Sequence, residues 1–331
     1  MRILFFGTKP YDRYFFEQAL ALEKYRGVEI HFIEPNLTPE TAMLAAGFQG
    51  VCAFVNMDLG TETIRRLDEY GVKLILLRCA GFNHVDLEEA DRRKIAVLRV
   101  PGYSPEAVAE HAMALALTAN RHMHKAYVKG RENDFSLSGL LGVNFYRKTA
   151  GIVGTGKIGA AMARICRGFG MEVLGYDLHP NKELDFVRYV DFDTLLAESD
   201  LISLHCPMTK ENYHMIQKET IDKMKDGVIL VNTSRGELIR TQDLVQGIRD
   251  GKFFAVGLDV YEEEKGSVYE DLSDKILTHS TMARLLSFPN VMVTSHQGFF
   301  TREALEAISS VTLDNALAWM EGRKSGNELH G

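Results

Sequence analysis

Short apolar runs alternate along residues 1–100 with segments whose apolar positions recur at helical spacing. The runs are 3–6, 28–33, 51–55, 74–77 and 96–100, and helical segments such as 12–24 and 61–70 lie between them. Runs this short, separated by helices, predict parallel strands joined by crossover helices. We therefore expect a first α/β domain with a flavodoxin-like sheet.

A second series of the same kind occupies residues 149–295. The strands that it predicts are 150–153, 172–176, 201–204, 228–231, 254–258 and 291–294, with helices such as 241–250 between them. This alternation predicts a second doubly wound domain. The segment 302–321, which carries the only tryptophan, Trp319, predicts one amphipathic helix that returns to the first domain.

A glycine-rich turn joins the first strand of the second series to its helix. Gly154, Gly156 and Gly159 have dinucleotide-turn spacing, and Asp177 ends the next strand, 18 residues after Gly159. Gly154 allows the tight turn, Gly156 lets the backbone approach a pyrophosphate, and Gly159 lets the helix pack against the strand. The helix start offers N–H groups and a positive dipole end to phosphates. The predicted cofactor contacts of this turn are Gly154, Thr155, Gly156, Lys157, Ile158 and Gly159.

Asp177 is expected to select the cofactor. Its carboxylate can accept hydrogen bonds from the ribose hydroxyls of NAD, and it would repel the extra phosphate of NADP. Two unit charges ~4 Å apart interact by roughly 4 kcal/mol at an effective dielectric constant of about 20, before salt screening. The following Leu178, His179 and Pro180 include no arginine to bind that phosphate. NAD is therefore the predicted cofactor.

These patterns predict an α/β fold of two doubly wound parallel-sheet domains, one flavodoxin-like and one of the Rossmann type, with a cleft between them. The predicted boundaries are 1–100 plus 299–331 for a discontinuous substrate domain and 101–298 for the NAD-binding domain. Prolines and glycine in 101–105 indicate a hinge. The helix predicted over 106–127 is rich in alanine and methionine, so it should be buried between domains or across a subunit interface.

Composition and charge limit the classes of partner that the protein is expected to bind. The 331 residues are 46% hydrophobic and 25% charged, as in ordinary globular proteins, and the net charge of −7 argues against nucleic acid or an anionic membrane as a partner. The four cysteines show no paired spacing, which predicts reduced thiols of a cytoplasmic protein and no metal site. The N-terminal apolar run stops at Gly7, too short for export or a membrane span, and predicts a buried strand.

Candidate catalytic groups follow the strands of the second domain. Arg235 follows the strand 228–231, and its planar guanidinium suits a substrate carboxylate, with a surface arginine in a turn as the alternative. His296 follows the strand 291–294, and a histidine suits the proton transfer that accompanies hydride transfer to a ketone. A structural histidine is the alternative there. His205 also ends a strand, where we favour cofactor lining over catalysis.

These segments together resemble the D-isomer-specific 2-hydroxyacid dehydrogenases, and within that family the D-lactate dehydrogenase branch. The resemblance covers nearly the whole chain. It rests on GTGKIG with Asp177, NTSRG at 232–236, LDVYEEE at 258–264, SHQGFF at 295–300 and the long connection 265–289.

The resemblance implies a role for each motif. Arg235 would anchor the substrate carboxylate, His296 would be the acid/base, and Glu264, the third of three consecutive acids, would pair with His296. The implied substrate-binding groups are the N–H groups of Ala80 and Gly81 and the side chains of Tyr103 and Phe299. The residues that it places along NAD are Cys206, Pro207, Asn212, Thr233, Ser234 and Asp259.

The implied reaction is reversible hydride transfer between NADH and pyruvate, giving D-lactate. A bulkier 2-keto acid remains an alternative because pocket volume is not readable from sequence, and so does a non-enzymatic NADH-sensing protein of the same fold. The resemblance further implies a homodimer built through the nucleotide domain. Gly298 and His84 depart from the alanine and asparagine expected in the family, which leaves their effect on domain closure open.

Overall fold

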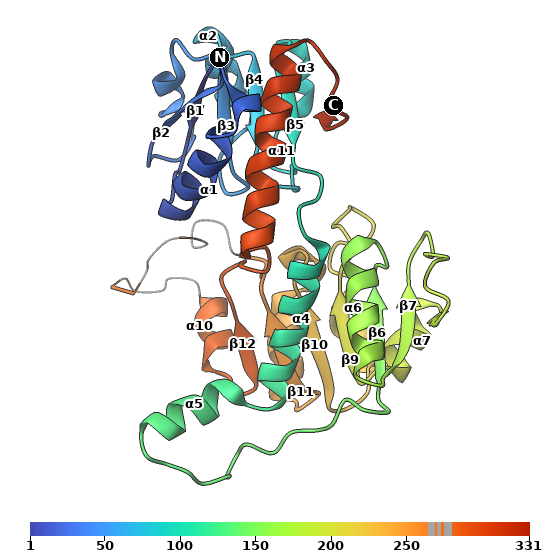
Figure 1. The fold of residues 1–331 in the computed structure, drawn as a ribbon. Helices are drawn as coiled ribbons and strands as arrows, with labels where there is room; N and C mark the ends of the chain where they lie inside the picture. The colour runs from blue at the N-terminus through green and yellow to red at the C-terminus, as the bar shows by residue number, and fades with distance from the viewer. Residues whose placement is uncertain (264–268, 270–272, 275–279) are drawn as a thin grey trace. The chain divides into compact units, whose positions relative to one another are not determined.

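The computed structural model describes residues 1–263, 269, 273–274 and 280–331. The chain divides into two units, drawn in Figure 1. Unit 1 comprises Met1–Ser104 and Phe300–Gly331, and unit 2 comprises Pro105–Phe299. Each unit contains its own sheet and its own hydrophobic core.

The sheet of unit 1 has the strand order β13-β5-β4-β3-β1-β2. Its strands are β1 Arg2–Phe5, β2 Glu29–Phe32, β3 Gly50–Ala53, β4 Leu74–Leu77, β5 Ala96–Arg99 and β13 Glu328–Leu329. The first five are parallel in the order 2-1-3-4-5, which confirms the predicted flavodoxin-like sheet. The two-residue β13 pairs antiparallel with β5 and was not predicted.

Four α-helices accompany this sheet in the described part of unit 1. They are α1 Pro10–Leu20, α2 Thr61–Glu69, α3 Leu87–Arg92 and α11 Arg302–Met320. Helix α11 contacts α1, β4 and β5, and its Leu313 and Ala316 are buried in the same core as Ile3 and Phe5. Trp319 packs against that core. The prediction that the last helix returns to the first domain is therefore confirmed.

The sheet of unit 2 has the order β12-β11-β10-β9-β6-β7-β8. Its strands are β6 Thr149–Val153, β7 Glu172–Tyr176, β8 Val187–Tyr189, β9 Leu201–Leu204, β10 Val228–Asn232, β11 Phe253–Leu258 and β12 Val291–Val293. All neighbouring strands are parallel. Read across the sheet, the strands β8-β7-β6-β9-β10-β11 have the Rossmann order 3-2-1-4-5-6, and β12 lies beyond β11 at the edge. The predicted Rossmann domain is confirmed, with β8 as an unpredicted short strand.

Helices cover both faces of this sheet. They are α4 Pro105–Asn120, α5 Met123–Arg131, α6 Lys157–Gly168, α7 Phe192–Glu198, α8 Lys218–Lys223, α9 Thr241–Arg249 and α10 Ser280–Ser287. One core contains buried residues of α4 and α6, and the other contains buried residues of α7, α8 and α9. None of the helices in the described ranges is long and apolar enough to cross a membrane.

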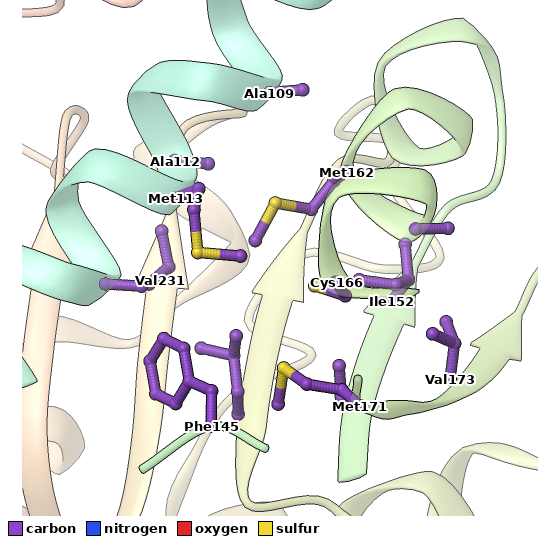
Figure 2. Packing of buried hydrophobic residues seen from close by; sticks show 14 of the residues in the cluster. Ala109, Ala112, Met113, Phe145, Ile152, Met162, Cys166, Met171, Val173 and Val231 are labelled. Atoms are coloured by element: carbon purple, nitrogen blue, oxygen red, sulfur yellow. The ribbon is translucent and has the colours of Figure 1, made fainter. Parts of the chain in front are cut away.

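The single helix predicted over 106–127 is wrong in length. Helix α4 ends at Asn120, and His122 adopts a left-handed backbone conformation with φ 50° before α5 begins. Ala109, Ala112 and Met113 of α4 lie against Met162 of α6 within unit 2, as Figure 2 shows. The small apolar residues are therefore buried inside their own unit, and neither a domain interface nor a subunit interface is needed to bury them.

Candidate functional site

Loops at the carboxyl edge of the unit 2 sheet contact one another. A Cβ added to Gly154, after β6, would lie 2.6 Å from the backbone nitrogen of Cys206, after β9. The Ser234 hydroxyl, after β10, donates to the Cys206 carbonyl. A Cβ added to Gly236 would lie 2.1 Å from the carbonyl carbon of Tyr261, after β11. The loops after β6, β9, β10 and β11 therefore pack together along the edge at which doubly wound sheets bind their ligands.

The glycine turn has the geometry expected of a phosphate-binding turn. Gly154 adopts φ +88°, and a Cβ on Gly159 would lie 1.8 Å from the Gly154 carbonyl oxygen, so both positions require glycine. Among the described residues, nothing lies within 4 Å of a Cβ added to Gly156, and no side chain caps the N-terminus of α6. The turn therefore leaves open space beside uncapped helical N–H groups.

A cavity of about 650 Å³ lies beside this turn. Its walls include Thr155, Gly156, Lys157 and Asp177. The cavity thus combines helix N–H groups and a lysine for phosphates with a carboxylate for ribose hydroxyls. The residues present fit NAD.

Asp177 is held in place at the end of β7. Its Oδ2 accepts hydrogen bonds from the backbone nitrogen of Thr155 at 2.5 Å and from Thr155 Oγ1 at 2.9 Å, and its Oδ1 accepts from the His179 nitrogen at 2.8 Å. Burial raises the pKa of Asp177, but these hydrogen bonds outweigh burial and leave the pKa below its usual value. Tyr189 on β8, which sequence reasoning missed, donates to Thr155 Oγ1 at 3.1 Å.

Asp259 organises the loop that carries His296. The Asp259 side chain is buried, and its Oδ1 accepts from His111 Nε2 at 3.1 Å, Thr294 Oγ1 at 2.5 Å and the Gln297 nitrogen at 2.9 Å. Its Oδ2 accepts from the Gly298 nitrogen at 2.7 Å. Burial alone would raise the pKa of Asp259, but the hydrogen bonds lower it to about 2.

His296 is half-buried in this loop. Its backbone nitrogen donates to the Asp259 carbonyl at 2.9 Å, and its carbonyl accepts from the Tyr269 hydroxyl at 3.0 Å. Its φ of 53° is left-handed, a conformation that a histidine adopts when the surrounding contacts impose it. Glu264, the predicted partner of His296, lies outside the described residues, so that pairing stays a prediction.

Arg235 follows β10 with its side chain half-buried. Its Nη1 donates to the Ser234 carbonyl at 2.7 Å, and Asn232 Nδ2 donates to the Arg235 carbonyl at 2.8 Å. No carboxylate in the described ranges forms an ion pair with Arg235. Its positive charge is therefore available to an anionic substrate.

Glu262, the first of the three consecutive acids, has a structural role that sequence reasoning missed. Its Oε1 lies 2.6 Å from His214 Nε2, and its Oε2 accepts from both the backbone nitrogen and the hydroxyl of Thr241 at 3.1 Å. Thr241 is the first residue of α9. Glu262 therefore joins the loop after β11 to the start of α9.

The remaining predicted cofactor contacts lie on the loops after β9 and β10. Asn212 Nδ2 donates to the Pro207 carbonyl at 2.7 Å. The Thr233 hydroxyl is buried and has no partner within the described residues, which leaves it available to a ligand. Burial raises the pKa of the Cys206 thiol to about 11 and lowers that of His205 to about 4, so both side chains are neutral near pH 7. A neutral His205 agrees with cofactor lining rather than acid catalysis.

The predicted substrate contacts belong to both units. Ala80 and Gly81 are half-buried residues that follow β4 in unit 1, and their N–H groups have no hydrogen-bond partner in the described part of the chain. Tyr103 is also in unit 1. Phe299 is a buried residue of unit 2, with its ring 6.4 Å from that of Tyr269.

Comparisons with known proteins agree with one another. The family model for "D-isomer specific 2-hydroxyacid dehydrogenase, NAD binding domain" matches residues 113–298. D-lactate dehydrogenase of Escherichia coli K12 is 46% identical over 332 residues, which cover 99% of this chain and 100% of the relative. The structure reported for the pyruvate reductase of Chlamydomonas reinhardtii superposes with a TM-score of 0.93 at 41% identity, over 99% and 98% of the two chains. D-lactate dehydrogenase with NAD⁺ from Lactobacillus jensenii superposes with a TM-score of 0.84 at 31% identity, over 100% of both chains.

Proposed function

Because this chain belongs to the D-isomer-specific 2-hydroxyacid dehydrogenase family, we propose that it interconverts pyruvate and D-lactate. Membership of the family makes the protein an NAD-dependent oxidoreductase, as the sequence predicted. The observation that supports the proposed reaction most is Arg235, which forms no ion pair with the described residues and lies on the same sheet edge as the His296 loop. We keep 1–100 plus 299–331 as the proposed substrate domain and 101–298 as the proposed NAD-binding domain.

The substrate carboxylate would be bound by Arg235 and by the N–H groups of Ala80 and Gly81. A guanidinium offers two parallel donors to a carboxylate, and the two N–H groups, which have no partner among the described residues, gain a hydrogen bond when an anion binds. Tyr103 and Phe299 would contact the methyl group of pyruvate.

His296 would move the proton. NADH, when bound, supplies the hydride that reaches the carbonyl carbon of pyruvate. A ring nitrogen of His296 donates its proton to the carbonyl oxygen, so the C=O group becomes CH–OH, and the reverse reaction returns that proton to His296. Glu264 would pair with the imidazole and orient it, and Arg235 would stabilise negative charge that develops on the oxygen.

NAD would lie along the unit 2 edge. The glycine turn and Lys157 would bind its pyrophosphate, and Asp177 would accept from its ribose hydroxyls. The Thr233 hydroxyl, which has no partner among the described residues, would gain one. The other proposed contacts are Cys206, Pro207, Asn212, Ser234 and Asp259. The two oxygens of Asp259 already accept four hydrogen bonds, so its proposed role is to fix the neighbouring loop beside the cofactor.

We further propose a cytoplasmic homodimer. All four cysteines are free thiols, as suits a reducing compartment. Helix α5 has no buried residues, and Phe135, Leu137 and Leu141 in the segment that follows it are each more than three-quarters exposed. An exposed apolar segment of this kind is typical of a subunit interface. Sedimentation should show a dimer that dissociates after Leu137→Asp with Leu141→Asp, but not after the control Leu22→Asp in unit 1, and a wild-type monomer would contradict the proposal.

The substrate is tested by steady-state oxidation of NADH with a panel of 2-keto acids. The proposal predicts the highest kcat/KM with pyruvate and lower values with 2-ketobutyrate, phenylpyruvate, hydroxypyruvate and glyoxylate. A higher kcat/KM with a bulkier acid would keep the reaction and change the substrate. NADH binding without turnover of any acid would favour a sensor protein instead.

A further inference from the structure

Arg99 holds the loop that follows the neighbouring strand of unit 1. Arg99 is the last residue of β5 and pairs in register with Leu77, the last residue of β4. Its Nη1 donates to the Ala80 carbonyl at 3.0 Å, and its guanidinium lies over the Phe82 ring, 4.9 Å from the ring centre. One arginine therefore contacts both sides of Gly81.

The bonded carbonyl belongs to the same peptide group as the Gly81 N–H. When a peptide oxygen accepts a hydrogen bond, the amide polarises and its N–H becomes a stronger donor. A cationic donor has the larger effect, because charge-assisted hydrogen bonds are about twice as strong as neutral ones. The Gly81 N–H has no partner in the described part of unit 1, so this added donor strength is available to a ligand.

The charge of Arg99 is not neutralised by the described residues. Arg78, at the start of the same loop, lies 3.4 Å from Asp12, and Arg93 pairs with Glu89, whereas no carboxylate in the described ranges pairs with Arg99. Its backbone is fixed at both ends, because its nitrogen donates to the Asn327 carbonyl at 3.1 Å and its own carbonyl accepts from Asn315 Nδ2 at 2.9 Å. A fixed positive charge therefore remains beside the Ala80–Gly81 peptide.

We propose that Arg99 is a positioning residue for the substrate carboxylate, which fixes and polarises the Ala80–Gly81 peptide so that its N–H binds the anion more tightly. The inference rests on the proposed function, because only that function assigns the Gly81 N–H to a keto-acid carboxylate. Arg99 acts through the peptide and needs no contact with the substrate. Its loss should weaken keto-acid binding and leave NADH binding unchanged.

The experiment compares Arg99→Met, Arg99→Lys and the control Arg92→Met in the full chain. Arg92 is an arginine of the same unit whose side chain is 68% exposed. Arg99→Met should raise KM for pyruvate about tenfold, because the Ala80–Gly81 peptide loses both its polarisation and the contact that fixes its loop, with kcat within about twofold. Arg99→Lys should recover part of the loss because it keeps a cationic donor. Arg92→Met should leave KM unchanged, and the Kd for NADH should not change in any variant.

A second substrate separates this role from a merely structural one. Methyl pyruvate lacks the carboxylate charge, so its KM should rise less than that of pyruvate in Arg99→Met. Equal increases for both substrates, or a fall in melting temperature with weakened NADH binding, would overturn the inference. An active wild type whose KM for pyruvate does not respond to Arg99→Met would overturn this inference alone. A wild type that reduces no keto acid would overturn it together with the proposed function.

Discussion

Replacement of Asp259 by asparagine tests the hydrogen-bond network that holds the His296 loop. Each carboxylate oxygen accepts from a backbone nitrogen, Oδ1 from Gln297 and Oδ2 from Gly298. In either orientation of the new side chain, its NH₂ group would therefore face a backbone N–H. At least one backbone donor would lose its acceptor, and no rotation of the amide can avoid this loss.

Two considerations give similar values for the loss of stability that this substitution causes. A pKa of about 2, against the usual 3.8, corresponds to about 2–3 kcal/mol of extra stability from the charged form of Asp259. A buried N–H without an acceptor costs ~1–3 kcal/mol. The two values describe the same network and are therefore not added. We expect Asp259→Asn to lower the free energy of unfolding by about 3 kcal/mol. At ~2–4 °C per kcal/mol for a unit of this size, the melting temperature should fall by about 6–12 °C.

Thermal unfolding of the full chain without cofactor measures this fall. The pKa of Asp259 is lower in the folded state, so its stabilisation is complete above the unfolded pKa and is lost as the pH falls through the folded value. The difference in melting temperature should be full at pH 7 and shrink as the pH drops below ~4. Asp226→Asn, at a side chain that is 91% exposed, is the matched control. A melting temperature that falls by less than about 2 °C at pH 7, or by as much as that of the control, would refute the reasoning.

Three further substitutions test the proposed roles. His296→Asn should lower kcat by ~10²–10⁴-fold while the Kd for NADH stays unchanged, and normal turnover would remove His296 as the acid/base. Arg235→Lys should raise KM for pyruvate about tenfold because an ammonium cannot copy the two-pronged guanidinium, so an unaltered KM in steady-state assays would count against the anchor. Asp177→Ala should lower the preference for NADH over NADPH tenfold or more, and an unchanged ratio of kcat/KM values would mean that another residue selects the cofactor.

The alternation of apolar runs and helices was sufficient to predict both sheets and their types. Strands such as Leu74–Leu77 and Leu201–Leu204 are buried at every position, which produces short continuous apolar runs. The break at His122 was missed because a single residue with a left-handed backbone separates the two helices, and α5 begins at the next residue. The strands Val187–Tyr189 and Glu328–Leu329 are too short to form a pattern of their own.

The sequence was sufficient to predict those parts of the site whose residues lie close together in the chain. It did not reveal contacts between residues that are far apart in the chain. The glycine turn places its three glycines within six positions, so the conformational need of each could be argued from spacing alone. His111 stands 148 positions before Asp259, and no local pattern connects them. The one available signal was a histidine among the buried alanines of α4, which indicates a polar partner. Arg99 was missed for the same reason, since its contact with Ala80 depends on the pairing of β5 with β4.

The most direct test of the proposed reaction is the chirality of its product. Purified protein is incubated with pyruvate and NADH until the absorbance of NADH stops falling, and the lactate formed is resolved by chiral chromatography. The proposed function predicts D-lactate in an amount equal to the NADH consumed. L-lactate, a racemic product, or consumption of NADH without lactate would contradict it.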